Sequence, residues 1–423
     1  MSTTPAARDH DDPVISSEPA VASEGLGKGQ IEIGVIVAGP LDMVDARAAK
    51  LAVEQSDAKL REWFPRFRFN FFEIKRPEMT SEGRVEPSVL LRGAMEERDA
   101  KHWDFAIVLT AAELVGNYSP FCFAALSRPL DAAAISLSLI DPLALGVEVD
   151  HGTRIERIAR RLSRLMLHAL AHLTGLNRSD DPTNLLFHPS DARELDQMTE
   201  VDPEELNRQR EAFAAIADQR LEEQAHAKRS SWPIFATRAA WINRREIAEA
   251  VMAARPWEFP KRLSRLTIAS FSTLAVLFMT AESWDLALAQ RPWRVMVLVL
   301  ASLLMTTFYV ILRQQLLVRR GQRRSEQSVV TSVSAFGIVG AGMAVTWLTL
   351  FAIGILLAHL LFPTELIATW AGSTVHGESE LSWIDRPHMA MFSASLGLLI
   401  GALGASFENQ HYFRHIIFVD EEI

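Results

Sequence analysis

The chain has 423 residues, of which 49% are hydrophobic and 22% charged, and it carries a formal net charge of −9. This composition is too apolar for a disordered chain and too charged for a protein made only of membrane helices. The acidic balance argues against a dedicated nucleic-acid binder. The single cysteine, Cys122, excludes an intrachain disulfide framework and a zinc module built from cysteines.

The first 29 residues are rich in Ser, Pro, Ala and Asp. They lack the charged and then apolar pattern of a signal peptide. We therefore expect residues 1–29 to form a disordered tail in front of a cytosolic domain.

Residues 30–200 alternate between strand and helix patterns. Apolar or alternating runs predict strands at residues 30–38, 67–74, 105–109 and 133–140. The spacing of apolar residues predicts helices at residues 42–64 and 87–98. Strands that alternate with helices are typical of an α/β fold, so we expect a mostly parallel sheet.

A third helix is predicted to start at a capping box formed by Thr153 and Glu156. Gly175 can end this helix in a left-handed conformation. His168 and His172 are four residues apart, so both imidazoles project from one face of the helix. In this geometry a helix supplies two ligands to a zinc ion, and the third follows a glycine turn.

Around these histidines the sequence resembles a known family. The segment from His168 to Gly175 resembles the zinc helix of metzincin peptidases. In detail it resembles the archaemetzincin pattern HExxHxxGxxHC, which continues with four residues, a cysteine, one residue and a methionine. Residues 104–114 resemble the family's strand that ends in a T-x-x-D-L turn, and residues 132–137 its edge strand beside the substrate cleft. The resemblance covers residues 31–187 and implies a mixed sheet with helices around a zinc-peptidase site.

The chemical residues of that pattern are replaced in this chain. Ala169 stands at the position of the general base, and an alanine cannot take up a proton. Arg178 stands at the third ligand position, where its permanent charge repels zinc. Leu186 falls on the methionine position, and the two cysteine positions carry Ser179 and Asn184. The resemblance therefore implies a pseudo-peptidase, which keeps the fold and has lost the catalytic residues.

Two alternatives stay open at this site. In the first, His168 and His172 bind zinc with a substitute third ligand, and the domain is a metallopeptidase. The candidates for that ligand are Asp180, Asp181 and His188. In the second, Arg178 occupies the metal position as a fixed cation that pairs with one of the two aspartates. We expect no cofactor, with zinc as the alternative.

Five arginines lie close together on the same predicted helix. They are Arg154, Arg157, Arg160, Arg161 and Arg164. They form either a solvated face or a surface that docks on anionic lipid headgroups or on an acidic partner.

Residues 201–260 are predicted to form a helical connector. A helix starts at Asp202-Pro and is expected to extend to about residue 225, and residues 228–233 have the composition of a linker. A further helix at residues 239–253 either lies on the membrane surface or packs as an ordinary helix.

Beyond residue 261, long apolar runs alternate with short polar loops. Four runs contain no Asp, Glu, Lys or Arg: residues 266–281, 295–312, 336–362 and 389–407. Runs of this kind mark membrane spans, so we expect an all-α transmembrane bundle of four helices over residues 261–423. The first run is short for a span, and the third, at roughly 40 Å as a helix, exceeds the ~30 Å hydrocarbon core.

The loops between these runs predict the orientation. Arginines concentrate between the second and third runs and mark the cytoplasmic side, so both termini are expected to be cytoplasmic and the chain to lie in the cell (inner) membrane. Except for His359, the four runs carry no ionisable side chain, which argues against a transporter.

Small residues recur in the last two runs. The fourth run has them at every fourth position, namely Ser393, Gly397, Gly401 and Ala405, and the third begins with Gly337, Gly340 and Gly342. Small residues at such spacings allow helices to approach closely, either within one bundle or between two copies in a homo-oligomer.

The sequence thus predicts a multi-pass membrane protein with a catalytically inactive, metzincin-like cytosolic domain that serves as a binding or scaffold module. The alternatives are a membrane-tethered zinc metallopeptidase with an atypical ligand set and a transporter or channel that the soluble domain regulates. The expected partners are the lipid bilayer and a protein that the sequence does not identify.

Overall fold

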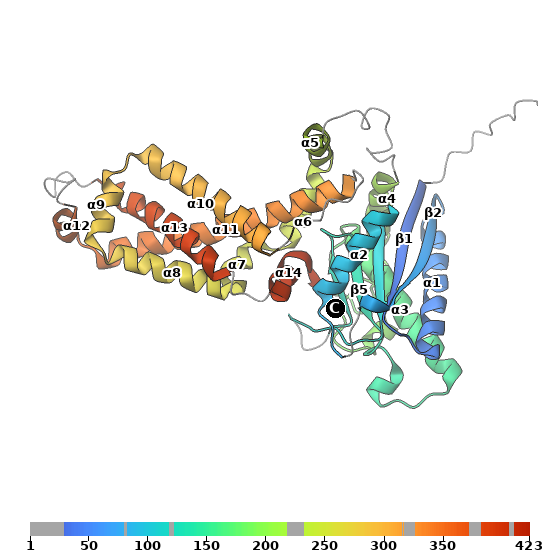
Figure 1. Ribbon diagram of the computed structural model, residues 1–423. Coiled ribbons are helices and arrows are strands. Elements are labelled where there is room, and N and C mark those ends of the chain that lie inside the picture. Colours follow the sequence, from blue (N-terminus) through green and yellow to red (C-terminus); the bar gives the residue numbers. More distant parts are fainter. Residues whose placement is uncertain are drawn as a thin grey trace, which may run out of the picture.

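A computed structural model describes residues 29–79, 83–117, 122–217, 232–314, 316, 326–371, 382–405 and 410–423. Figure 1 shows two parts: a sheet with helices packed against it, and an elongated group of helices beside it. The predicted tail up to residue 28, the predicted linker up to residue 231 and the arginines at 319–324 lie outside the described residues.

The first part is built on a six-stranded mixed sheet with the order β2-β1-β3-β5-β4-β6. Its strands are β1 (Gly29–Ala38), β2 (Phe67–Arg76), β3 (Phe105–Thr110), β4 (Ala124–Ser127), β5 (Ala132–Ser136) and β6 (Glu421–Glu422). The pairs β1/β2, β1/β3 and β3/β5 are parallel, whereas β4 is antiparallel to both β5 and β6. The α/β prediction is confirmed as a mixed sheet with helices.

One strand prediction is wrong. Residues 132–137 were expected at the sheet edge, but β5 lies between β3 and β4. The strand next to β6 is β4, a run of only four residues whose alternation is too short to stand out in the sequence.

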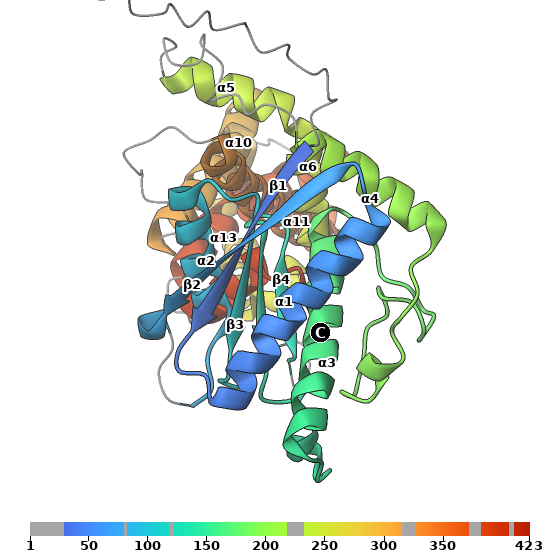
Figure 2. The ribbon, with the colours of Figure 1, turned by 90° about the vertical axis from the view of Figure 1, so that its right-hand side faces the viewer.

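Four helices belong to this part, and they cover both faces of the sheet. They are α1 (Met43–Trp63), α2 (Pro87–Lys101), α3 (His151–Leu173) and α4 (Pro203–Ile216). Helices α1 and α3 pack on one face, and α2 lies on the opposite face (Figures 1 and 2). Because both faces are covered, every residue of β3 is buried.

Aspartates begin three of these helices. The side chains of Asp42, Asp150 and Asp202 accept hydrogen bonds from backbone N–H groups in the first turns of α1, α3 and α4. The predicted capping box at Thr153 is therefore wrong, since Asp150 is the N-cap and accepts from the Thr153 N–H at 3.1 Å. The predicted end of α3 is confirmed, because Gly175 has a φ of +94°.

The predicted connector consists of several short helices. After α4 they are α5 (Trp232–Ile242), α6 (Arg244–Ala253), the 3₁₀ turn Pro256–Glu258 and α7 (Phe259–Arg262). The helix expected at residues 239–253 is thus interrupted at Asn243 and belongs to two helices.

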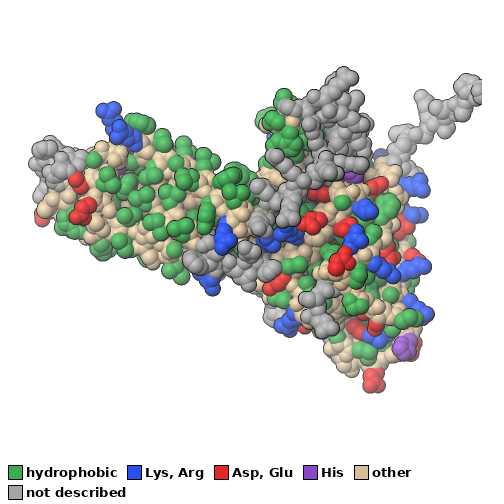
Figure 3. Space-filling view, viewed as in Figure 1, with side chains coloured by type: hydrophobic (Ala, Val, Ile, Leu, Met, Phe, Trp, Pro, Cys, Tyr) green, Lys and Arg blue, Asp and Glu red, His purple; other side chains and the backbone are tan. Residues whose placement is uncertain are grey.

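The second part contains the apolar helices. They are α8 (Ser264–Phe278), α9 (Ala281–Ala289), α10 (Pro292–Arg313), α11 (Glu326–Leu361), α12 (Thr364–Trp370), α13 (Asp385–Ala405) and α14 (Gln410–Phe418). Two of them, α10 and the part of α11 from Ser328, are long and apolar enough to cross a membrane. A third such segment results if α8 and α9, which meet at a bend of 88°, count as one span. Figure 3 shows mostly hydrophobic and uncharged side chains on this part.

The two parts form one unit. Leu90 and Leu91 of α2 share a buried cluster with Phe259 of the connector and with Val310 and Ile416 of the second part. After α13 the chain returns through α14, which packs against α2, and ends in β6 at the side of the sheet.

The small residues of the apolar helices pack within the chain. A Cβ added to Gly401 would lie 1.7 Å from the Ser270 hydroxyl oxygen of α8. A Cβ added to Gly342 would lie 1.9 Å from the ring of Phe259. The close contacts of Gly342 and Gly401 are thus intramolecular, and association of two copies through α11 and α13 stays a prediction.

Replacement of Gly342 with alanine should destabilise the packing of α7 on α11. Phe259 is fully buried, so its ring cannot move aside freely, and such overpacking costs about 1–3 kcal/mol. The matched control is Gly340→Ala, because a Cβ there would lie 3.9 Å from Thr307, which is an ordinary contact. Thermal unfolding in detergent should show a lower Tm for Gly342→Ala alone. Equal Tm values for both variants would contradict this prediction.

Candidate functional site

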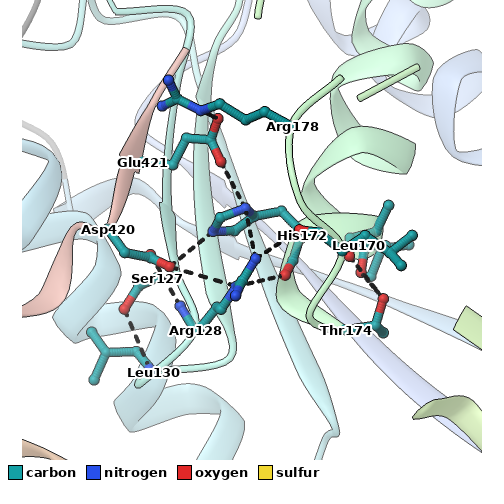
Figure 4. A network of polar contacts seen from close by, with 11 residues as sticks. Ser127, Arg128, Leu130, Leu170, His172, Thr174, Arg178, Asp420 and Glu421 are labelled. Atoms are coloured by element: carbon teal, nitrogen blue, oxygen red, sulfur yellow. Dashed lines mark hydrogen bonds and ion pairs between the residues drawn. The ribbon is translucent and has the colours of Figure 1, made fainter. Parts of the chain in front are cut away.

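The candidate site lies where the last two turns of α3 face strands β4 and β6 (Figure 4). His168 and His172 project from one side of α3, as their spacing predicts, and both are buried. The carboxylates that contact His172 come from Asp420 and Glu421, which follow the apolar helices in the chain.

His168 is a neutral, structural histidine in this arrangement. Its Nδ1 lies 2.7 Å from the carbonyl oxygen of Leu185 and therefore donates to it. Burial lowers the pKa of His168 to about 4, against a smaller opposing effect of the Glu421 charge. The loop after Gly175 is thus tied back to the helix through this imidazole.

His172 lies between two carboxylates. Its Nε2 is 2.8 Å from Asp420 Oδ2, and its Nδ1 is 2.7 Å from Glu421 Oε2. Burial alone would lower the pKa of His172, but the charge of Asp420 and the hydrogen bonds to both carboxylates raise it to about 9. The side chain is therefore an imidazolium that donates from both nitrogens.

Two arginines complete the positive side of the site. Arg178 Nε donates to Glu421 Oε1. Arg128 donates from Nε to the carbonyl oxygen of His172 at 2.9 Å, and its backbone N–H donates to Asp420 Oδ1 at 3.2 Å. Burial alone would raise the pKa of Glu421, but the hydrogen bond and charge of His172 lower it well below its usual range. Three cations thus surround two buried carboxylates.

The backbone of the acidic segment is held as a strand. Ile423 N–H donates to the Ala124 carbonyl at 2.8 Å, and Asp420 N–H donates to the Leu126 carbonyl at 3.1 Å. Glu421 points towards α3, whereas Glu422 accepts from the Asn117 N–H at 2.9 Å, as strand alternation requires. The side chain of Ile423 is 1% exposed and belongs to the core under α1 and α3.

The other predicted site residues have structural surroundings. Ala169 is fully buried in the core between α3 and the sheet. Leu186 packs with Ala171 and Leu176 in a small separate cluster. Asp181, one of the predicted substitute ligands, accepts from the N–H and hydroxyl of Thr183.

The partner that the structure gives to Arg178 is Glu421, rather than either predicted aspartate. Sequence reasoning missed Arg128, Asp420 and Glu421. The signal was an acidic ending, Asp-Glu-Glu-Ile, directly after an apolar run, and such an ending does not say where it docks.

The site residues do not fit a zinc ion in this arrangement. A zinc ligand must offer a lone pair, and both nitrogens of His172 carry protons that are donated to carboxylates. Arg178 brings a permanent cation to the same carboxylate. Among the residues that the structure describes, no group of three or more His, Cys, Asp or Glu side chains is placed to hold a metal.

Most of the arginine row on α3 is bound within the domain. Arg154 pairs with Asp141 at 2.6 Å, and the buried Arg161 pairs with Asp196 at 2.6 Å. Arg164 donates to the carbonyl oxygen of Leu195. Neither predicted role, a solvated face or a docking surface, describes these three side chains.

Among solved structures, several resemble part of this chain. The chain is similar to an archaemetzincin from Methanopyrus kandleri, at 16% identity and a TM-score of 0.36, over 46% of this chain and 99% of that one. It is similar to a zinc-dependent peptidase from Methanocorpusculum labreanum, at 15% identity and a TM-score of 0.34, over 42% of this chain and 99% of that one. A further match is an archaemetzincin from Archaeoglobus fulgidus complexed with malonate, at 10% identity and a TM-score of 0.29, over 42% of this chain and 99% of that one.

No family model and no curated protein matches the sequence. The resemblance to archaemetzincins is confirmed as a structural similarity over less than half of the chain. At these identities and TM-scores, the similarity assigns no reaction, metal or ligand to this chain.

Proposed function

We propose that this protein is a multi-pass membrane protein whose sheet domain is a non-catalytic binding module for an acidic, extended segment. In this arrangement the segment is the chain's own Asp420–Ile423. Two elements bind the segment. The edge of β4 that faces away from β5 pairs with the backbone of the segment, and the cations at and after the end of α3 pair with its carboxylates.

One observation carries this proposal: both nitrogens of His172 are engaged by the carboxylates of Asp420 and Glu421. The surrounding cations, with Arg128 and Arg178, outnumber these carboxylates, so the site favours acidic side chains over neutral ones. Strand addition to a sheet edge supplies affinity through the backbone, and the side-chain sites supply selectivity. The same arrangement supports binding over hydrolysis, because Ala169 is no general base.

The membrane part of the proposal comprises four spans with both termini on the cytoplasmic side. When α8 and α9 count as one span, they make three spans with α10 and α11, and we assign α13 as the fourth. Its 21 residues correspond to about 30 Å, the thickness of the hydrocarbon core. It packs along α8, α10 and α11, which supports a common direction for the four segments.

A peptide-binding measurement tests the binding module. The full chain without residues 420–423, in detergent or nanodiscs, should bind a synthetic peptide Phe-Val-Asp-Glu-Glu-Ile. The full-length chain should bind it much more weakly, because its own segment competes. The matched peptide Phe-Val-Asn-Gln-Gln-Ile should bind at least about tenfold more weakly, since a hydrogen bond to a charged group contributes ~1.5–3 kcal/mol.

Absence of binding to a shortened chain whose β3 amides stay protected from hydrogen exchange would overturn the proposal. If the shortened chain loses this protection, the sheet needs β6 to fold. That result would also contradict the proposal, because β6 would then not be a ligand that another segment can replace. The metallopeptidase alternative is tested separately by the zinc content and peptide cleavage of the full-length protein. One equivalent of zinc, lost on changing His168 and His172 to Ala, would favour that alternative.

A further inference from the structure

Helix α5 has an unusual surface for a helix outside the apolar bundle. Its sequence, Trp-Pro-Ile-Phe-Ala-Thr-Arg-Ala-Ala-Trp-Ile, contains a single charged residue, Arg238. Ile234 is 62% exposed and Trp241 is 70% exposed, and Ile242 on the same side is exposed as well. A helix that is apolar nearly all round is normally buried in protein or in lipid.

One side of α5 is fixed to the start of α11. Phe235 and Ala239 form a buried cluster with Val329 of α11. Val329 is the second residue of the Ser328–Leu361 part of α11, which is long and apolar enough to cross a membrane. This contact holds α5 beside the first turn of that segment.

The direction of α5 differs from that of the apolar helices. Figure 1 shows α10 and α11 lengthwise and α5 nearly end-on, whereas Figure 2, turned by 90°, shows α5 lengthwise. Helix α5 therefore lies across the long direction of the bundle. If the bundle crosses a bilayer, α5 lies along the plane of its surface.

Basic side chains accompany the exposed apolar ones. Arg238 on α5 and Arg244 at the start of α6 are exposed, and the Arg244 guanidinium lies 5.0 Å from the centre of the Trp241 ring. Within the described part of the chain, no carboxylate lies within ion-pair distance of either arginine. Indole rings beside arginines are typical of helices that lie among lipid headgroups.

We propose that α5 and the start of α6 form an interfacial helix that binds the anionic headgroups of the cytoplasmic leaflet. Ile234, Trp241 and Ile242 insert at the boundary between headgroups and acyl chains. Arg238 and Arg244 pair with lipid phosphates and carboxylates, since the cytoplasmic leaflet carries the anionic lipids. This inference rests on the proposed membrane insertion of the bundle.

A fluorescence experiment on the full chain tests the inference. Cys122 is fully buried, and burial, with the nearby charge of Glu422, raises the pKa of its thiol, so thiol reagents should label only introduced cysteines. An environment-sensitive fluorophore is attached at Ile242→Cys, at Leu304→Cys on α10 and at Met43→Cys on α1. Leu304 is exposed on the apolar bundle and reports its insertion, whereas Met43 is exposed on the sheet domain.

Each labelled chain is placed in nanodiscs that hold one copy each and contain lipids with a nitroxide either on the headgroup and upper acyl chain, which reports position 242, or at the end of the acyl chain, which reports position 304. We expect quenching at positions 242 and 304 and none at 43. Quenching at 242 should be stronger with phosphatidylserine than with phosphatidylcholine alone. The double variant Arg238→Gln, Arg244→Gln should bring the ratio between the two lipids close to one.

The outcomes separate this inference from the proposed function. Quenching at 304 without quenching at 242 overturns the interfacial helix and leaves the membrane bundle in place. Absence of quenching at both positions overturns membrane insertion itself. Equal quenching at position 242 in both lipids would overturn the anionic preference.

Discussion

Replacement of His172 with alanine should release strand β6 from the sheet. The side chain is the only one that contacts both Asp420 and Glu421 from α3, and those two carboxylates are 3% and 2% exposed. The imidazolium of His172 offsets the cost of removing these carboxylates from water. Without it, two negative charges stay buried with fewer cations beside them. Breaking a buried pair from one side costs about 3–5 kcal/mol.

Hydrogen exchange in the full chain measures this effect. The amides of Asp420 and Ile423, which donate to β4, should exchange much faster in His172→Ala than in the unchanged protein. The control is His151→Ala, which removes an exposed histidine at the first turn of the same helix. Unchanged protection of β6 in His172→Ala would contradict the prediction.

A compensated variant separates local release from general unfolding. In His172→Leu combined with Asp420→Asn and Glu421→Gln, the buried charges disappear together with their partner. Removing all members of a buried ionic group costs much less than removing one. The arginines left over, Arg128 and Arg178, are partly exposed and can be hydrated. Protection of β6 should therefore recover in the triple variant.

The sequence predicts those elements that depend on nearby residues. Strands β1, β2 and β3 lie where their apolar runs place them, and α3 carries both histidines on one face. The end of α3 follows from Gly175, whose left-handed conformation needs no distant partner. The start of α3 was mispredicted because Asp150, three residues before Thr153, is the better acceptor for the first turn.

The half of the site that comes from β6 depends on long-range pairing. Leu126 and Glu421 are neighbours in the sheet although the whole apolar part of the chain lies between them. A strand of two residues is too short to show alternation of apolar and polar residues. An acidic segment is also normally predicted to be exposed to solvent. The partner of Arg178 was sought among nearby aspartates for the same reason.

In the apolar part, too, the sequence predicts local features better than contacts between distant residues. Long uncharged runs predict α10 and α11, because length and hydropathy are properties of the segment itself. The break at Met279 and Thr280 was not predicted, since no proline or glycine marks it. The role of the small residues was open from sequence, because Gly342 permits contact with any helix and only the fold brings Phe259 to it.

The stability of the sheet domain should pass through a maximum near pH 6.5. The pKa of His172 is raised from 6.5 to about 9 in the folded chain, so its contribution is fully present below pH 6.5. Between pH 6.5 and 9 the folded state binds one proton more than the unfolded state. The free energy of unfolding therefore falls by about 1.4 kcal/mol per pH unit, and His172 has lost its contribution above pH 9.

His168 acts in the opposite direction. Its pKa is lowered from 6.5 to about 4, so below pH 6.5 the unfolded state binds the additional proton and stability falls as the pH decreases. The contribution of Glu421, whose pKa is also lowered, is present above about pH 4.5 and is lost on further acidification. The two histidines together thus place the maximum where both contribute fully.

The free energy of unfolding is measured from the slowest-exchanging amides of β3 in the full chain, corrected for the intrinsic pH dependence of exchange. His172→Gln should remove the decrease above pH 6.5 and leave the decrease below it. His168→Gln should do the reverse, which assigns each side of the profile to one imidazole. A profile that stays flat from pH 6.5 to 9 in the unchanged protein would show that His172 is not held as an imidazolium, and the ionic pairing with Asp420 and Glu421 would then not be what holds β6 in place.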